Sequence, residues 1–312
     1  RDREMNPDMS QVEAFAGQVV TDVAAAMSGV MTSLGNKLGL YKALAGAGAL
    51  TSDDLATKTG LHERYVREWL NNQVAGGYII YQPQDGTYEL PDAHALVLAV
   101  DGSPVFLVPA LEVCAADWIG ALDGVQDRLS AGGRIADVGC GHGASAIILA
   151  KAFPNSTVYG FDSHVESIDI ARQRASEAGL SGNLRFETAL AKGYDERDFD
   201  LICFMDCLHD MGDPVGAARH ACDALNPGGS LLLVEPAAND GVENNINPVS
   251  RLYYAASTGV CTPCSLSQDV REGLGAQAGP GRLAKVLAEA GFGTVRVAAR
   301  TPFNIVLEAR KL

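Results

Sequence analysis

Asp137-Val138-Gly139-Cys140-Gly141-His142-Gly143 joins a predicted strand, Arg134–Val138, to a predicted helix, Ala144–Phe153, in this chain of 312 residues. Glycines at such a junction let the backbone turn sharply and approach a ligand closely. Free N–H groups at the start of the helix attract a carboxylate or a phosphate. The stretch therefore predicts a ligand-binding loop of the α/β type. It also satisfies the dinucleotide pattern G-x-G-x-x-G/A, so it does not by itself identify the ligand.

From Arg134 onward, strand-like and helix-like segments alternate. The further expected strands are Thr157–Phe161, Leu184–Glu187, Asp200–Met205 and Ser230–Glu235. The helices between them are Val165–Ala178 and Pro214–Leu225, the second ended by Asn226-Pro227-Gly228-Gly229. This alternation predicts a largely parallel sheet covered by helices on both faces.

The C-terminal end departs from this pattern. Helix Arg282–Ala290 is followed by strand Thr294–Ala298 and, after a short break, by strand Phe303–Ala309. So short a connection cannot form a parallel crossover, and we expect an antiparallel hairpin there. Residues 111–312 are therefore expected to form one α/β domain around a seven-stranded sheet.

The first 110 residues are organised differently. Apolar residues at helical spacing predict helices from Gln11 to Leu50, interrupted at Gly35 and Gly39. Thr51-Ser52-Asp53-Asp54 supplies N-cap candidates for a short helix, and a second helix follows over Glu63–Asn71. This is a helix-turn-helix pattern.

A hairpin follows these helices. The β-favouring runs Tyr78–Tyr81 and Thr87–Leu90 flank Asp85-Gly86, a strong hairpin signal. Helix-turn-helix plus hairpin predicts a winged helix in residues 1–110, a module that binds DNA or forms dimers. DNA-facing helices need basic side chains, yet acidic residues outnumber basic ones here. We therefore expect a homodimer rather than DNA binding, on a segment that carries Lys58, Arg64 and Arg67 against Asp53, Asp54, Glu63 and Glu68.

Composition limits the class of protein further. Hydrophobic residues make up 47% and charged residues 20%, as in ordinary globular chains. The net charge of −14 and the pI near 4.8 oppose polyanionic partners. No uninterrupted apolar run approaches the length of a membrane span, and Arg1–Ser10 is charged, so we expect a cytoplasmic protein without a membrane contact.

The seven cysteines are scattered and odd in number, which predicts reduced thiols rather than a disulfide framework. Cys261 and Cys264 have C-x-x-C spacing, but a zinc site usually needs four ligands and no second pair is present. The sequence therefore predicts no metal site.

Asp162 ends the second predicted strand of the α/β domain. That position lies beside the glycine loop, where a carboxylate can accept hydrogen bonds from both hydroxyls of a ribose. NAD and S-adenosylmethionine would both use such an acid. The alternative is that Asp162 only begins a turn.

Three features together distinguish these cofactors. Asp137 precedes the glycines, Pro227-Gly228-Gly229 precedes the fifth strand, and a C-terminal hairpin replaces the parallel strands of a nicotinamide enzyme. Residues 134–312 thereby resemble the class I methyltransferases, whose fold is Rossmann-like. The resemblance implies S-adenosylmethionine as cofactor and a donor site that includes Asp137, Gly139, Cys140, Gly141, Asp162, Ser163, Ala189, Met205 and Asp206.

The segments Phe204–Asp210 and Leu233–Glu235 narrow the resemblance to small-molecule O-methyltransferases. In that family the histidine matching His209 is the general base, and the glutamate matching Glu235 helps to hold it. Those enzymes also carry an N-terminal winged-helix dimerisation domain. Nearly the whole chain resembles bacterial, notably mycobacterial, winged-helix methyltransferase-like proteins, through strings such as Glu63–Leu70, Cys207–Pro214 and Leu274–Gly279.

Two departures from these families stand out. Cys114–Ala116 runs almost directly into Asp117–Ile119, where the closer family has a longer, partly helical segment, and the sequence leaves open whether a substrate-covering lid is missing near Ala116. Plant-type enzymes carry a further catalytic glutamate before the last helix, whereas Gln277-Ala278-Gly279-Pro280 offers none.

The chemistry expected of this chain is methylation of a small molecule, most readily at a hydroxyl oxygen. His209 near a strand end suits proton removal, and the alternative is that it caps the turn while Asp210 starts the next helix. Tyr253 and Tyr254 are expected to line the acceptor pocket. The alternative function is a winged-helix transcriptional regulator that senses S-adenosylmethionine or a metabolite.

Overall fold

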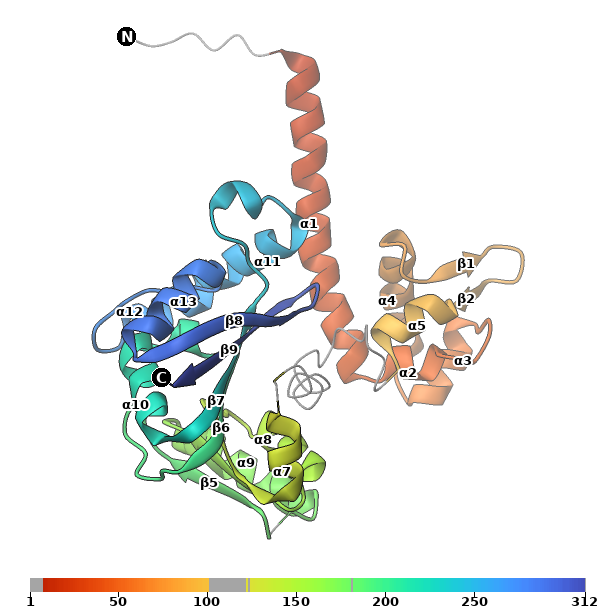
Figure 1. The fold of residues 1–312 in the computed structure, drawn as a ribbon. Coiled ribbons are helices and arrows are strands. Elements are labelled where there is room, and N and C mark those ends of the chain that lie inside the picture. Colours follow the sequence, from red (N-terminus) through yellow and green to blue (C-terminus); the bar gives the residue numbers. More distant parts are fainter. Residues whose placement is uncertain (1–7, 101–121, 123, 181, 312) are drawn as a thin grey trace. The chain divides into compact units, whose positions relative to one another are not determined.

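The computed structural model describes residues 8–100, 122, 124–180 and 182–311. It divides into two compact units, Arg1–Ala110 and Leu111–Leu312, which are considered separately (Figure 1). The expectation about a lid near Ala116 lies outside the described residues.

The first unit is a helical domain with a small wing. Its core joins helices to a two-stranded antiparallel hairpin, with Tyr41, Trp69 and Leu70 buried at its centre. Thr51 and Asp54 form the predicted N-cap as a capping box, and Gly60 ends that helix with φ +69°. The elements are α1 (Met9–Lys37), α2 (Leu40–Leu44), α3 (Ser52–Thr59), α4 (Glu63–Ala75), β1 (Ile80–Gln82), β2 (Thr87–Glu89) and α5 (Asp92–Leu98).

Gly35 does not interrupt the first helix, contrary to the sequence-based prediction, whereas Gly39 does separate α1 from α2. The reason lies in packing. A Cβ at Gly35 would stand 2.3 Å from the ring of Trp69, whose indole N–H donates to the Met31 carbonyl over 2.8 Å. Gly35 is thus the residue that lets α4 approach α1 closely.

The helix α1 is exposed along most of its length. It satisfies the length and composition of a membrane-spanning helix, with a mean hydropathy of 1.3 in its most apolar window and none of that window buried. Polar residues such as Gln18, Thr21 and Asp22 interrupt its apolar runs, which is why the sequence did not single it out.

The second unit is built on a seven-stranded sheet in the order β5-β4-β3-β6-β7-β9-β8. The first five strands pair in parallel and the C-terminal hairpin pairs antiparallel, as predicted. Figure 1 shows the long blue β8–β9 hairpin beside β7. The strands are β3 (Arg134–Val138), β4 (Thr157–Asp162), β5 (Leu184–Thr188), β6 (Phe199–Met205), β7 (Leu225–Pro236), β8 (Phe292–Arg300) and β9 (Asn304–Lys311).

Helices cover both faces of this sheet, as the alternation predicts. Side chains of α7 (Val125–Gly132), α8 (Ala144–Ala152) and α9 (Val165–Glu177) share one buried cluster with Ile135. Side chains of α10 (Pro214–Ala224) and α13 (Gly279–Glu289) share another with Ala136 and Val138. Successive residues of β3 therefore pack on opposite faces, as a doubly covered parallel strand requires.

One predicted boundary is wrong. Asn226–Gly229 does not separate the helix from its strand, because β7 already begins at Leu225. Leu225 pairs with Phe199 of β6, and the pairing shifts register before it resumes at Leu201 and Ser230. The turn-forming residues are therefore accommodated as an irregularity within the strand.

Candidate active site

The candidate residues gather where the parallel strands β3, β4, β6 and β7 end. The chain leaves β3 toward β4 on one side and returns through β6 on the other, so the strand order reverses between β3 and β6. In open α/β sheets such a reversal leaves a crevice at the carboxyl ends of the strands, which is where ligands bind.

The glycine loop is held against the segment that follows β6. Gly139 has φ +77°, and a Cβ there would stand 2.7 Å from Cys207 Sγ. The Cys207 thiol donates to the Val138 carbonyl over 3.1 Å. Only glycine fits this position, because both its backbone conformation and its close neighbour exclude a side chain.

Asp137 is fully buried at the end of β3. Burial raises the pKa of its carboxyl to about 6, although the Ser145 hydroxyl and the Ala146 N–H donate to it. Its Oδ1 is buried without a hydrogen-bond partner. A buried oxygen left in this state is costly unless a ligand supplies the missing donor.

Asp162 lies at the end of β4 and shapes the glycine loop. Its Oδ2 accepts from the Gly141 N–H over 2.9 Å, and its Oδ1 accepts from the His164 N–H over 2.9 Å. The Ala189 N–H donates to the Asp162 carbonyl over 2.9 Å, while Ser163 is exposed.

Asp206 follows Met205 at the end of β6 in a strained conformation. Its φ is +58°, in the left-handed region that non-glycine residues seldom adopt. Its Oδ1 is buried without a hydrogen-bond partner. Burial and the nearby Glu235 raise the pKa of Asp206 to about 6. Strain together with an unpaired oxygen is typical of a functional position.

His209 and Glu235 form a buried ion pair across neighbouring strands. His209 lies in the short helix η1 (Leu208–Asp210) after β6, and Glu235 lies near the end of β7. The His209 Nδ1 donates to Glu235 Oε2 in a very short hydrogen bond, and the Leu208 N–H donates to Glu235 Oε1 over 3.1 Å. The carboxylate thus sets the orientation of the imidazole ring.

The charge of His209 follows from this setting. Burial of the ring lowers the pKa of His209, but the carboxylates of Glu235, Asp210 and Asp206 raise it more, to about 9. His209 does not cap a helix, because Asp213 caps α10 by accepting from the Gly216 N–H. The histidine is therefore held as an imidazolium at neutral pH.

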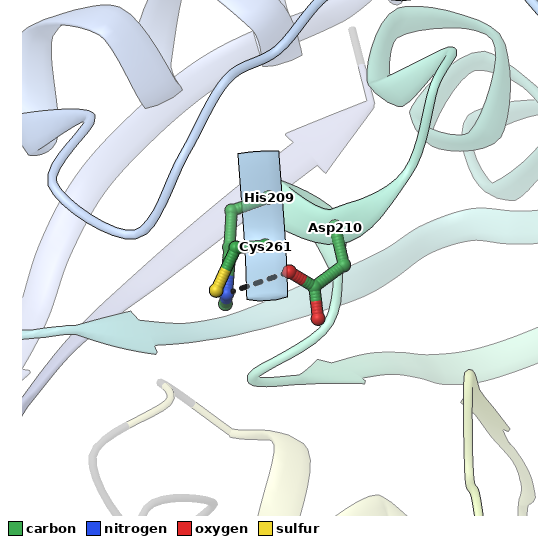
Figure 2. Close-up of side chains that lie close together, drawn as sticks. All are labelled: His209, Asp210 and Cys261. Carbon is green, nitrogen blue, oxygen red and sulfur yellow. Dashed lines mark ion pairs between the residues drawn. The ribbon is translucent and has the colours of Figure 1, made fainter. Parts of the chain in front are cut away.

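The other ring nitrogen of His209 faces a second group of side chains. Its Nε2 lies 3.2 Å from Asp210 Oδ1, an oxygen that is buried without a hydrogen-bond partner. Cys261 approaches the same nitrogen from the π-helix η3 (Ser257–Cys261), as Figure 2 shows.

The two tyrosines expected at the acceptor pocket differ in their surroundings. Both lie in α11 (Pro248–Ala256). The Tyr253 hydroxyl donates to the Phe303 carbonyl over 2.8 Å, and burial together with the charge of Asp206 raises its pKa to about 12. Tyr254 is exposed and lines a cavity of about 800 Å³ with Ile246 and Leu252. Tyr253 is therefore the one electrostatically coupled to Asp206.

Residues 129–291 match a family described as "Methyltransferase domain", a match over more than half of the chain. The chain belongs to this methyltransferase family. Residues 25–100 match the "Rv2258c-like winged HTH domain". Both families agree with the resemblance drawn from the sequence.

Curated relatives match a shorter part of this chain. The 27-O-demethylrifamycin SV methyltransferase of Amycolatopsis mediterranei is 35% identical over 107 residues, which are 34% of this chain and 39% of that protein. A ubiquinone biosynthesis O-methyltransferase of Shewanella sp. (strain ANA-3) is 33% identical over 102 residues, 32% of this chain and 42% of that protein. The chain thus spans about two fifths of the length of these relatives.

Solved structures show the same fold over nearly the whole chain. Human N-acetylserotonin methyltransferase, in complex with S-adenosylmethionine, has a TM-score of 0.63 and 18% identity, covering 100% of this chain and 99% of that chain. The mitomycin 7-O-methyltransferase MmcR has a TM-score of 0.62 and 17% identity, covering 96% and 99%. The class I methyltransferase fold with an N-terminal winged helix is therefore confirmed.

Four other histidines have different surroundings from His209. His142 is exposed in the glycine loop, and His164 caps α9 by accepting from the Ser167 N–H. His62 caps α4, and His220 binds the Tyr194 carbonyl. Of these, the three that lie in the second unit make no contact with the His209–Glu235 pair among the described residues.

The contacts of several side chains in the site were not predicted from the sequence. Ser145 donates to Asp137, Cys207 braces the glycine loop, and Cys261 meets His209 and Asp210. The Gln277 amide, just before α13, donates to the Ala237 carbonyl over 3.0 Å. Most of these contacts join segments that are distant in sequence. Ser145 is the exception, because it lies on the first turn of α8, eight residues after Asp137.

Proposed function

We propose that this chain transfers a methyl group from S-adenosylmethionine to a hydroxyl oxygen of a small molecule, with His209 as general base. The observation that carries the proposal is the buried His209–Glu235 pair at the ends of β6 and β7. The names of the relatives support it, because several are O-methyltransferases of small molecules. The hydroxyl acceptor and the roles of the individual residues are parts of this proposal.

The residues at the strand ends fit the proposed donor. Asp137 and Asp206 each present a buried oxygen without a hydrogen-bond partner, as an ammonium group or a hydroxyl of the donor would need. Gly139 and Gly141 let the backbone of the loop approach the donor closely, and Asp162 lies beside them. When bound, S-adenosylmethionine supplies a methyl group on a positively charged sulfur, which the carboxylates of this site favour. We assign Cys140, Ser163, Ala189 and Met205 to the same donor site because they flank these residues at the strand ends.

His209 would act through Nε2, since Glu235 holds Nδ1. Asp210 Oδ1 lies 3.2 Å from Nε2 without hydrogen-bond geometry, so an acceptor hydroxyl can take its place. The neutral ring accepts the hydroxyl proton while Glu235 stabilises the resulting imidazolium. Tyr253 and Tyr254 would line the acceptor pocket, where positioning supplies much of the rate.

The direct test measures transfer of a labelled methyl group to a panel of phenols and alcohols. Each acceptor is paired with its methyl ether, in which the reacting hydroxyl is blocked. We expect label on at least one free hydroxyl and none on the matching ether. Label on nitrogen or carbon instead would contradict the acceptor class. Tight binding of S-adenosylhomocysteine without transfer to any acceptor would favour the regulator.

We also propose that the chain is a cytoplasmic homodimer joined through the first unit. The apolar residues of α1 recur at helical spacing and are 41–65% exposed at Val12, Phe15, Val19, Val23 and Val30. In a single copy of the described residues these five side chains, which form an apolar stripe along α1, are exposed to water. Exposure of so long an apolar face to water is unfavourable. The acidic composition opposes DNA as its partner.

Glutamate substitutions on α1 test the dimer. We expect Phe15→Glu combined with Val23→Glu to convert the dimer to a monomer in sedimentation velocity, because charges placed in an apolar interface lose their hydration. Ala14→Glu combined with Gln18→Glu adds the same charge away from the stripe and should leave the dimer intact. A wild-type chain that sediments as a monomer, or that needs detergent to stay in solution, would contradict the proposal.

A further inference from the structure

A cluster of three different side chains surrounds the outer nitrogen of the His209 ring. Its Nε2, one carboxylate oxygen of Asp210 and the Cys261 thiol all lie within 4.8 Å of one another (Figure 2). His209 and Cys261 are buried. Imidazole, carboxylate and thiolate are the donor types that proteins use for zinc.

The spacing of these atoms suits a tetrahedral ion. Two ligands of nitrogen and oxygen type on tetrahedral zinc are about 3.3 Å apart, and a nitrogen–sulfur pair is about 3.6 Å apart. The distance between His209 Nε2 and Asp210 Oδ1 is 3.2 Å, which already matches the separation of two such ligands on zinc. The Cys261 Sγ lies within 4.8 Å of both atoms, so it has to approach them by no more than about 1.2 Å to become the third ligand.

Three further observations point to a cation here. The Asp210 Oδ1 is buried without a hydrogen-bond partner and faces the His209 ring, 3.2 Å from Nε2. The far side of the His209 ring donates to Glu235 Oε2, which is how zinc-ligating histidines are usually oriented by a carboxylate. The π-helix that carries Cys261 is also a feature found mostly at functional sites.

We propose that His209 Nε2, Asp210 Oδ1 and Cys261 Sγ form a binding site for a zinc-class divalent cation that inhibits methyl transfer. Binding forms Zn–N, Zn–O and Zn–S bonds and releases the Cys261 thiol proton and the Nε2 proton to solvent, without electron transfer. The ion would bind the lone pair of His209 Nε2, which in the proposed reaction accepts the proton of the acceptor hydroxyl. The inhibition therefore rests on the proposed general base, whereas the binding does not.

The binding is tested with the full chain in metal-free buffer. Cobalt(II), a spectroscopic substitute for zinc, should give thiolate-to-metal absorption at one ion per chain, and zinc should displace it. Cys261→Ser should abolish the thiolate band, and Glu235→Gln should lower zinc affinity by about 10- to 100-fold. Cys264→Ser is the matched control, since Cys264 lies one helical turn further on and is exposed, and it should keep both signals.

Other outcomes would overturn the proposal. A thiolate band that persists in Cys261→Ser and disappears in Cys264→Ser would place the ion elsewhere. If Cys261→Ser does not fold, Asp210→Asn takes its place and should weaken zinc binding while it retains the thiolate band. Zinc should also stop methyl transfer reversibly, with recovery on adding a chelator. Cobalt binding without inhibition would leave the metal site intact and count against His209 as the base.

Discussion

Replacing His209 with glutamine is expected to lower kcat for methyl transfer by about 10²- to 10⁴-fold, the usual contribution of a general base. Glutamine keeps a polar side chain of similar size but cannot take the hydroxyl proton. The measurement is steady-state transfer to the best acceptor from the panel, at saturating donor and with a chelator present. His220→Gln, which changes a histidine on α10 that binds the Tyr194 carbonyl, should keep wild-type kcat.

The pH dependence gives this prediction a second readout. The pKa of His209 is raised to about 9, and only the neutral ring accepts a proton, so kcat/KM should rise with pH through a midpoint near 9 and level off above it. Glu235→Gln removes the carboxylate that most strongly raises this pKa, so the midpoint should move to lower pH. A profile that is flat between pH 6 and about 9, or unchanged in Glu235→Gln, would exclude the role proposed for the pair.

The His209–Glu235 pair could be anticipated from the sequence because of how parallel strands are arranged. His209 follows one predicted strand and Glu235 ends the next, and these strands, β6 and β7, are neighbours. The carboxyl ends of parallel neighbours meet at one edge of a sheet, so a motif after each strand is enough to bring the two residues together. The same argument placed Asp137 and Asp162 beside the glycine loop.

Contacts made by segments outside the parallel sheet could not be anticipated in this way. The C-x-x-C spacing linked Cys261 to Cys264, yet the fold brings Cys261 close to His209 and Asp210, about 50 residues away. No strand order or periodicity links those segments. Gly35 was misassigned for a similar reason, since its place inside α1 depends on the ring of Trp69 in another helix.

The second large effect is expected at Asp162, where alanine should weaken S-adenosylhomocysteine binding by about 10- to 100-fold. A hydrogen bond to a charged group contributes about 1.5–3 kcal/mol, and 1.4 kcal/mol corresponds to a factor of ten in affinity. Alanine removes the proposed acceptor for the ribose hydroxyls, and it also frees the Gly141 N–H that Asp162 holds at 2.9 Å. Isothermal titration calorimetry measures the change directly, with NADH as the ligand that should not bind.

Asp169→Asn provides the matched control, because it removes an exposed carboxylate from α9, where Asp169 pairs only with Arg172 in the same helix. It should bind S-adenosylhomocysteine as tightly as the wild type. Asp162→Asn separates the two functions of Asp162, since an amide can still accept from the Gly141 N–H but carries no charge. An affinity within twofold of wild type in Asp162→Ala would mean that this carboxylate only shapes the loop, and the donor would then have to bind through Asp137 and Asp206.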